Sequence, residues 1–147
     1  MSGKISNLLV GSAGEYFVAG ELSRHGLVAA LTMSGTRAFD ILAVNEKTKQ
    51  QFTIQVKTTQ YKKATWMLSE KDEALRGKNA FYVFVRLNEM ALPDYYIVPA
   101  DDVARFISER HQAWLNTPGK AHKPNSIREF QVTEHDEEFF NRWDYFL

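Results

Sequence analysis

The sequence has no cysteine among its 147 residues, and this absence excludes disulfides, thiolate metal sites and cysteine nucleophiles. It also has no apolar run long enough to cross a membrane, and its first residues lack the apolar core and cleavage pattern of a signal peptide. Together these absences predict a cytoplasmic protein.

The chain also has no net charge, since 18 Lys and Arg residues balance 18 Asp and Glu residues. No global basic field therefore indicates a nucleic-acid-binding protein. Because salt screens charges over about 10 Å, however, local clusters matter more than the total. Cations gather at residues 47–63 and again at residues 120–128. Both segments are candidates for contact with phosphate groups.

Glycine-rich nucleotide signatures are absent as well, with neither a GxGxxG pattern nor a Walker loop in the chain. GSAG at residues 11–14 lies within a helical pattern and lacks the lysine of a phosphate-binding loop. No GxSxG signature of a nucleophilic serine occurs either. These absences argue against a Rossmann domain, a P-loop enzyme and a serine hydrolase of that type.

The order of predicted elements favours an α/β fold with a central mixed sheet flanked by helices, in one domain of residues 1–147. A first helix is predicted from Ile5 to His25, with an apolar face formed by Leu8, Leu9, Ala13, Phe17, Val18 and Leu22. Apolar patterns predict strands at residues 27–33, 38–45, 51–59, 80–87 and 94–99. The strands at 38–45 and 51–59 should form an antiparallel hairpin.

Three further helices are predicted in the second half of the chain. A short one is expected at residues 70–76 after Ser69, and a longer one begins at Asp101 or Asp102 and runs to about Trp114. The last is expected to start near residue 134 or 136 and to carry Phe139, Phe140, Trp143 and Phe146. Exposed aromatic residues on this last helix would suit an interface between subunits.

Polar side chains converge on the predicted hairpin. Glu15 lies in the first helix and Asp40 in the second strand, whereas Gln55 and Lys57 share one face of the third strand because side chains two apart point the same way. Asp40 shares its face with apolar residues, and a buried carboxylate is unfavourable unless a cation satisfies it. Mg²⁺ or Mn²⁺ bound by Asp40, with Lys57 nearby, would account for both charges. A structural ion pair or hydrogen bond of Asp40 is the alternative.

The pattern of these residues resembles the PD-(D/E)xK nuclease superfamily, which includes many restriction enzymes, archaeal Holliday-junction resolvases and small homing endonucleases. The matching features are G-x-x-G-E in a first helix, a strand with an Asp, a hairpin, and a strand with a polar residue two before a Lys. The resemblance assigns the helix acid to Glu15, the strand acid to Asp40 and the D/E-x-K tripeptide to residues 55–57. Gln55 replaces the second acid, which lowers the negative charge of the site, although similar nucleases with Gln at this position exist.

The resemblance implies a restriction-endonuclease-like core and a Mg²⁺- or Mn²⁺-dependent endodeoxyribonuclease. In that role Asp40, Gln55 and Glu15 hold the metal, and Lys57 lies against the attacking water and the scissile phosphate. DNA is the expected partner, with RNA still open, and cutting both strands favours a homodimer or a higher homo-oligomer. The alternative is a catalytically inactive module of the same fold that binds nucleic acid or assembles with a partner.

Polar residues near the mouth of this site are candidates for contact with a phosphate backbone. Ordinary roles in turns, strand ends and solvated loops are the alternative for each of them. The candidates are Thr36, Arg37, Thr58, Gln60, Lys62, Lys63, Lys120 and Lys123, the last two in a loop from Lys120 to Arg128.

Overall fold

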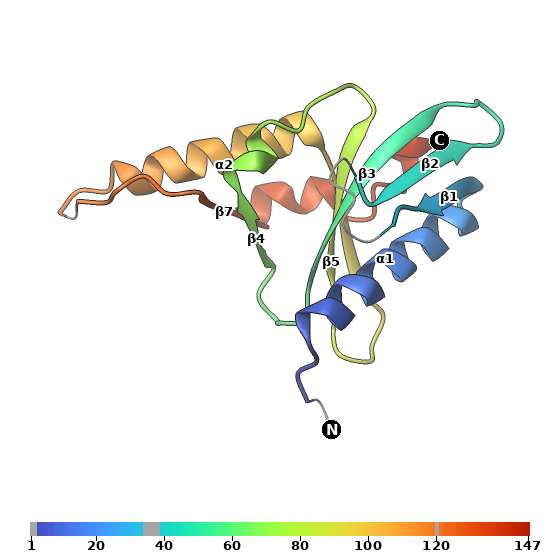
Figure 1. Ribbon diagram of the computed structural model, residues 1–147, viewed down its shortest axis with the longest axis horizontal. Coiled ribbons are helices and arrows are strands. Elements are labelled where there is room, and N and C mark those ends of the chain that lie inside the picture. The colour runs from blue at the N-terminus through green and yellow to red at the C-terminus, as the bar shows by residue number, and fades with distance from the viewer. Residues whose placement is uncertain (1–2, 34–38, 120) are drawn as a thin grey trace.

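A computed structural model describes residues 3–33, 39–119 and 121–147. Its centre is a five-stranded sheet in the order β1-β2-β3-β5-β6 (Figure 1). The strands are β1 (Leu27–Leu31), β2 (Ile41–Asn45), β3 (Gln51–Thr59), β5 (Ala80–Arg86) and β6 (Asp94–Pro99). Strands β3 and β5 are parallel, and the other neighbours are antiparallel. The predicted α/β fold with a mixed sheet and a β2–β3 hairpin is confirmed.

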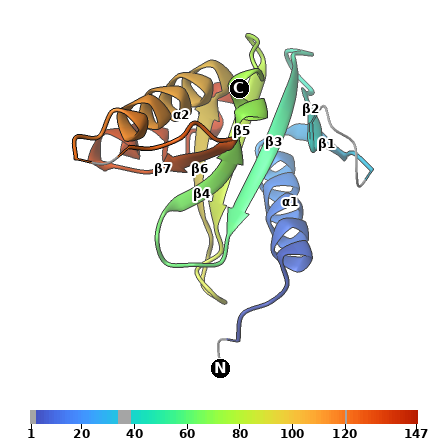
Figure 2. The same ribbon diagram turned by 60° about the vertical axis from the view of Figure 1, so that its left-hand side comes forward.

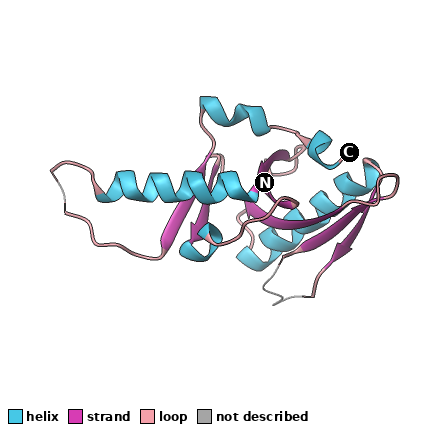
Figure 3. Cartoon of the chain, turned by 90° about the horizontal axis from the view of Figure 1, so that it is seen from above, coloured by secondary structure: helices cyan, strands magenta, loops and turns pink. Residues whose placement is uncertain are grey.

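Helices cover both faces of this sheet. Helix α1 (Asn7–Arg24) lies on one face, and α2 (Ala100–Leu115) lies on the other beside a small antiparallel sheet of β4 (Thr65–Ser69) and β7 (Ile127–Gln131) (Figure 2). Short 3₁₀ helices are η1 (Glu70–Glu73), η2 (Glu134–Phe139) and η3 (Trp143–Phe146). The loop between α2 and β7 projects at one end of the molecule (Figure 3). Across the described ranges, no helix is both long and apolar enough to span a membrane.

The two faces of the sheet form separate cores, and β5 is buried from Ala80 to Val85 because both faces are covered. On one face, Ile54 and Val83 belong to a core that includes α1. On the other face, Tyr82 belongs to a core that includes α2, β4 and β7. Side chains alternate along a strand, so Gln55 and Lys57 of β3 lie on the α2 face, whereas Val56 and Thr58 lie on the α1 face.

Helix α1 packs on the sheet through a stripe at four-residue spacing, which consists of Val10, Gly14, Val18 and Leu22. The helix has exposed apolar residues as well, and the predicted apolar face was wrong for Leu8, Leu9 and Phe17, which are exposed. Gly14 determines which face of α1 packs on the sheet. A Cβ atom on Gly14 would lie 1.8 Å from Oγ1 of Thr58, so only glycine lets α1 approach β3 this closely.

The C-terminal segment differs most from the prediction. A continuous helix from residue 134 or 136 was wrong, because η2 and η3 are separate 3₁₀ turns. Asn141 lies between them with a φ of 53°, and this left-handed conformation ends the first turn. Phe139, Trp143 and Phe146 are buried and form core, so only Phe140 of the four predicted aromatic residues is exposed as a subunit interface would require.

Candidate active site

Strands β2 and β3 separate at Asp40. Their pairing runs from Ile41 opposite Ile54 to Val44 opposite Gln51, so β3 extends beyond β2 from residue 55 onward. Asp40 lies at a bend just before β2, whereas the sequence predicted it within the strand. Its main-chain N–H still donates to the carbonyl of Ile54, with an N···O distance of 2.9 Å. Oδ2 of Asp40 also accepts a 2.8 Å hydrogen bond from the main-chain N–H of Val56, which lies two residues after Ile54 in β3.

Glu15 of α1 lies close to this carboxylate. Both acids line a cavity of about 400 Å³ between α1 and the β1–β2 side of the sheet. Burial raises the pKa of Glu15, and the negative charge of Asp40 raises it further. The close contact between Gly14 and Thr58 sets the height of α1 above β3 and so the place of Glu15, the next residue along the helix.

Opposing effects act on the carboxyl of Asp40. Burial raises its pKa, while the hydrogen bond from Val56 and the positive charge of Lys57 lower it. Burial is the largest of these causes, so the pKa remains above its ordinary value of 3.8. Burial raises the pKa of both acids and the charge of Asp40 raises that of Glu15, so the pair forms an environment in which a cation is favourable.

Gln55 and Lys57 lie on the α2 face of β3, where they line a depression of about 520 Å³. Asp72 of η1 and Tyr82 of β5 line the same depression. Nζ of Lys57 is 3.9 Å from Oδ1 of Asp72. Sequence reasoning missed Asp72 and Tyr82 because neither belongs to a motif. Tyr82 lies opposite Gln55 through the parallel pairing of β3 and β5, and Asp72 reaches Lys57 from η1.

The four motif residues therefore meet around the main chain of Val56. Asp40 is bound to its N–H, Glu15 lies near Asp40 on the α1 side, and Gln55 and Lys57 flank Val56 and face the α2 side. The charge of Lys57 acts on Asp40 across this short distance. The arrangement combines two carboxylates, an amide and an ammonium group at the point where two strands part.

The donor atoms suit a small, hard cation. In residues 3–33, 39–119 and 121–147, no group of three or more His, Cys, Asp or Glu side chains could hold a metal ion. The site therefore supplies two neighbouring carboxylates, those of Glu15 and Asp40, while Gln55 lines the depression on the α2 face of β3. Mg²⁺ typically takes one or two protein carboxylates and completes its octahedron with water and substrate phosphate, so the pair fits this ion.

Two of the residues predicted to contact nucleic acid, Thr58 and Gln60, have side chains that lie against other parts of the protein. Oγ1 of Thr58 is buried beneath Gly14 and has no hydrogen-bond partner in the described part of the chain. The side chain of Gln60 accepts a 3.0 Å hydrogen bond from the N–H of Ile5 and donates a 2.9 Å bond to its carbonyl. These positions favour structural roles over contact with DNA. The alternation of side chains could have shown this for Thr58, which follows Lys57 and so points the other way.

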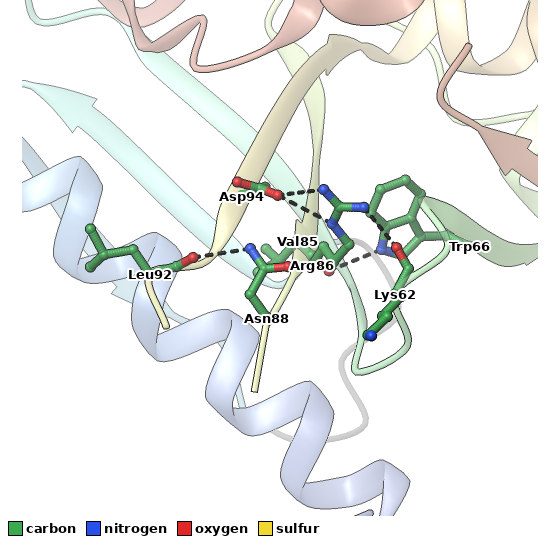
Figure 4. Close-up of polar contacts among 7 residues, drawn as sticks. All are labelled: Lys62, Trp66, Val85, Arg86, Asn88, Leu92 and Asp94. Atoms are coloured by element: carbon green, nitrogen blue, oxygen red, sulfur yellow. Dashed lines mark hydrogen bonds and ion pairs between the residues drawn. The ribbon is translucent and has the colours of Figure 1, made fainter. Parts of the chain in front are cut away.

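Lys62 and Lys63 lie in the exposed loop between β3 and β4, and Arg86 of β5 holds the main chain of this loop at Lys62 (Figure 4). Arg86 donates a 2.7 Å hydrogen bond from Nη1 to the carbonyl of Lys62. The same guanidinium pairs with Oδ2 of Asp94 at 3.1 and 2.7 Å. At the start of β4, the indole of Trp66 donates a 3.0 Å bond to the main chain of β5. The loop thus presents its two lysines from an anchored base.

The remaining candidates lie elsewhere in the sequence. Thr36, Arg37 and Lys120 lie outside the described residues. Lys123 is exposed in the loop between α2 and β7. This loop projects at the end of the molecule away from α1 (Figures 1 and 3). Arg128, at the end of the predicted basic loop, is buried and pairs with Glu73. It therefore does not contribute to a basic surface.

No family model matches the sequence, and no curated protein matches it. Solved structures do match. The Holliday junction resolvase Hjc of the archaeal hyperthermophile Archaeoglobus fulgidus aligns with a TM-score of 0.54 and 16% identity over 88% of each chain. The bacterial homing endonuclease I-Ssp6803I aligns with a TM-score of 0.59 and 13% identity, over 97% of this chain and 91% of that one. The chain therefore has the restriction-endonuclease-like α/β fold.

Proposed function

We propose that the protein is a Mg²⁺-dependent endodeoxyribonuclease. The observation that carries the proposal is the position of Asp40, which lies between Glu15 and Lys57 where β2 and β3 part. The fold supports it, because the two similar structures are a Holliday junction resolvase and a homing endonuclease. Neither composition nor net charge would have suggested this function.

Each motif residue has a role in the proposed reaction. Glu15, Asp40 and the amide oxygen of Gln55 would hold Mg²⁺ or Mn²⁺, which supplies a Lewis acid for the scissile phosphate. The ammonium group of Lys57 would donate to a non-bridging phosphate oxygen and stabilise the charge that develops there in the transition state. Glu15 would also accept a hydrogen bond from the attacking water and so orient it.

The substrate would lie across the β3–β4 loop, where Lys62 and Lys63 would contact the phosphate backbone. Thr36, Arg37, Lys120 and Lys123 stay predictions for the same role. Each phosphate contact that is lost should weaken binding in a salt-dependent way and largely independently of sequence.

A second copy of the chain would supply the second active site for a duplex. Edge strand β1 exposes Val28 and Leu31, and α1 exposes Leu8 and Tyr16 nearby on the rim of the Glu15 cavity. This apolar surface is a better candidate for the dimer contact than the C-terminal aromatic residues, of which Phe139, Trp143 and Phe146 are buried. Sedimentation equilibrium of the wild type and of Leu8→Glu tests it, because an added charge should shift the equilibrium to monomer.

The decisive experiment is cleavage of supercoiled plasmid and of a four-way DNA junction with Mg²⁺ or Mn²⁺. Wild type should cut at least one of them, while Asp40→Asn and Lys57→Ala should lose on the order of a hundredfold or more in rate. Lys78→Ala is the matched control, because Lys78 is an exposed lysine in the turn before β5 and lies outside both basic segments. Wild-type rates in both site variants would refute the proposal, and labelled RNA of the same shape tests the choice of DNA.

A non-catalytic module of the same fold is the second candidate, and Gln55 is the observation that favours it. With an amide in place of an acid, the site has only two carboxylates in the described part of the chain. A module of this kind would bind the junction equally well with EDTA or Mg²⁺ and would leave it intact. Gel-shift and cleavage measurements on one sample therefore separate the two functions.

A further inference from the structure

Asp72 is held rigidly in the depression beside the proposed active site. Its Oδ2 accepts a 2.9 Å hydrogen bond from the N–H of Ser69, and its Oδ1 accepts a 2.5 Å bond from the hydroxyl of Tyr82. Tyr82 is fully buried and stacks on Phe84 with a centroid distance of 5.5 Å. A donor from β4 and a donor from β5 therefore fix both oxygens of this carboxylate.

The carboxylate faces Lys57. Nζ of Lys57 lies 3.9 Å from Oδ1 of Asp72, which is close enough for attraction but too long for a direct hydrogen bond. Lys57 is also attracted to Asp40, so two carboxylates from different elements act on its ammonium group. Gln55, its neighbour on the same face of β3, is neutral and cannot hold Lys57 by charge.

We propose that Asp72 is a positioning residue that keeps the ammonium group of Lys57 over the scissile phosphate and is itself kept in place by Ser69 and Tyr82. This role rests on the proposed nuclease function, in which Lys57 touches the substrate and Asp72 does not. Asp72 is not assigned to the metal, because the described residues form no three-acid cluster around it.

The first test does not depend on cleavage. Isotope-coded acetylation with acetic anhydride, followed by peptide mass mapping, measures how strongly each lysine is shielded. Asp72→Asn should raise the labelling rate of Lys57 by about threefold, because the attraction that holds the amine is removed. Lys47 and Lys49, both exposed in the β2–β3 connection, should label at unchanged rates in the same sample. A folded Asp72→Asn protein with wild-type labelling of Lys57 would overturn the proposal.

Three further variants separate positioning from folding. Asp101→Asn is the matched control, because Asp101 also accepts a main-chain hydrogen bond, from Gly77 at 3.2 Å, and forms no pair with Lys57. It should leave Lys57 labelling unchanged. Tyr82→Phe keeps the charge of Asp72 but removes one of its two anchors, so it should give an intermediate rate. Asp72→Glu should restore most of the shielding, whereas a purely structural residue would not be rescued by charge.

The second test uses cleavage by the metal-loaded protein. Asp72→Asn should lower kcat by about tenfold and leave KM unchanged, because Asp72 acts through Lys57 rather than on DNA. In a Lys57→Ala background the same change should have no further effect, since the residue it positions is gone. Additive losses would overturn the proposal. If the wild type does not cleave, the nuclease proposal fails, and the labelling experiment still decides whether Asp72 holds Lys57.

Discussion

The carboxylate of Asp40 accepts a 2.8 Å hydrogen bond from the main-chain N–H of Val56. Val56 lies between Gln55 and Lys57, so this one bond fixes the carboxylate against the tripeptide that carries both side chains. The bond lies beyond the last β2–β3 pair, where the side chain of Asp40 replaces a main-chain partner. Burial nevertheless raises the pKa of Asp40, so the residue is well positioned but unfavourable as an anion.

Asp40→Asn should therefore fold and be at least as stable as the wild type at pH 8 without divalent ions. A carboxyl with a raised pKa gives its full contribution to stability below its ordinary value, 3.8 for Asp40, and loses it as the pH rises through the raised folded-state value. The amide oxygen of Asn can still accept from Val56. Circular-dichroism melts at pH 4 and pH 8 should show that the Tm of the variant increases relative to the Tm of the wild type as the pH rises.

The same melts test the rival interpretation of Asp40 as one member of a structural ion-pair cluster. Breaking such a cluster leaves an unpaired charge and is strongly destabilising. An Asp40→Asn protein that is unfolded at pH 8 would support the cluster and count against a metal site. Glu15→Gln should behave like Asp40→Asn, because burial and the charge of Asp40 raise its pKa from 4.5.

Mg²⁺ should stabilise the wild-type protein by relieving the repulsion between Glu15 and Asp40. At ten times the dissociation constant, a ligand that binds only the folded state adds about 1.4 kcal/mol. For a chain of this size that corresponds to a rise in Tm of about 3–6 °C. Differential scanning fluorimetry should show the rise in wild type and in Asp101→Asn, and no rise in Asp40→Asn. An equal rise in Asp40→Asn would place the metal elsewhere.

Gly14→Ala should destabilise the protein and displace Glu15, because its new Cβ would meet Oγ1 of Thr58 at 1.8 Å. Overpacking of this kind typically costs about 1–3 kcal/mol. Gly11→Ala is the matched control on the same helix, since nothing lies within 4 Å of a Cβ there. Removing a helical glycine should stabilise the protein by about 0.5–1 kcal/mol. Urea denaturation of both variants measures the difference, and equal stabilities would contradict the role of Gly14 as a close contact.

The parts of the fold that local pattern determines could be predicted from the sequence. Strands β3, β5 and β6 and the helix α2 were predicted close to their observed bounds. Strands β4 and β7 were not predicted, because they pair with each other across a long separation, with Thr65 opposite Gln131. The predicted apolar face of α1 was wrong in part. Exposed apolar residues make the apolar pattern of the helix irregular, and the contact of Gly14 with β3 determines which side packs on the sheet.

The candidate site shows the same division. Glu15, Asp40, Gln55 and Lys57 could be chosen because their types and spacing form a pattern along the chain. Asp72 has no such pattern, and its place beside Lys57 depends on the 3₁₀ turn η1 and on Tyr82, which lies opposite Gln55 in the parallel β3–β5 pair. A contact that depends on tertiary structure in this way leaves no local signal.

Gln55→Glu should strengthen Mg²⁺ binding, because it adds a third carboxylate to a site that has two in the described part of the chain. Isothermal titration calorimetry of the protein without DNA should show a dissociation constant lower by on the order of tenfold. Gln51→Glu is the matched control, since Gln51 is exposed at the start of the same strand. Residues four apart on a strand are separated by about 13 Å, beyond the Debye length of roughly 8 Å at physiological salt. An equal gain in both variants would show a general effect of net charge, and no gain in Gln55→Glu would remove residue 55 from the metal site.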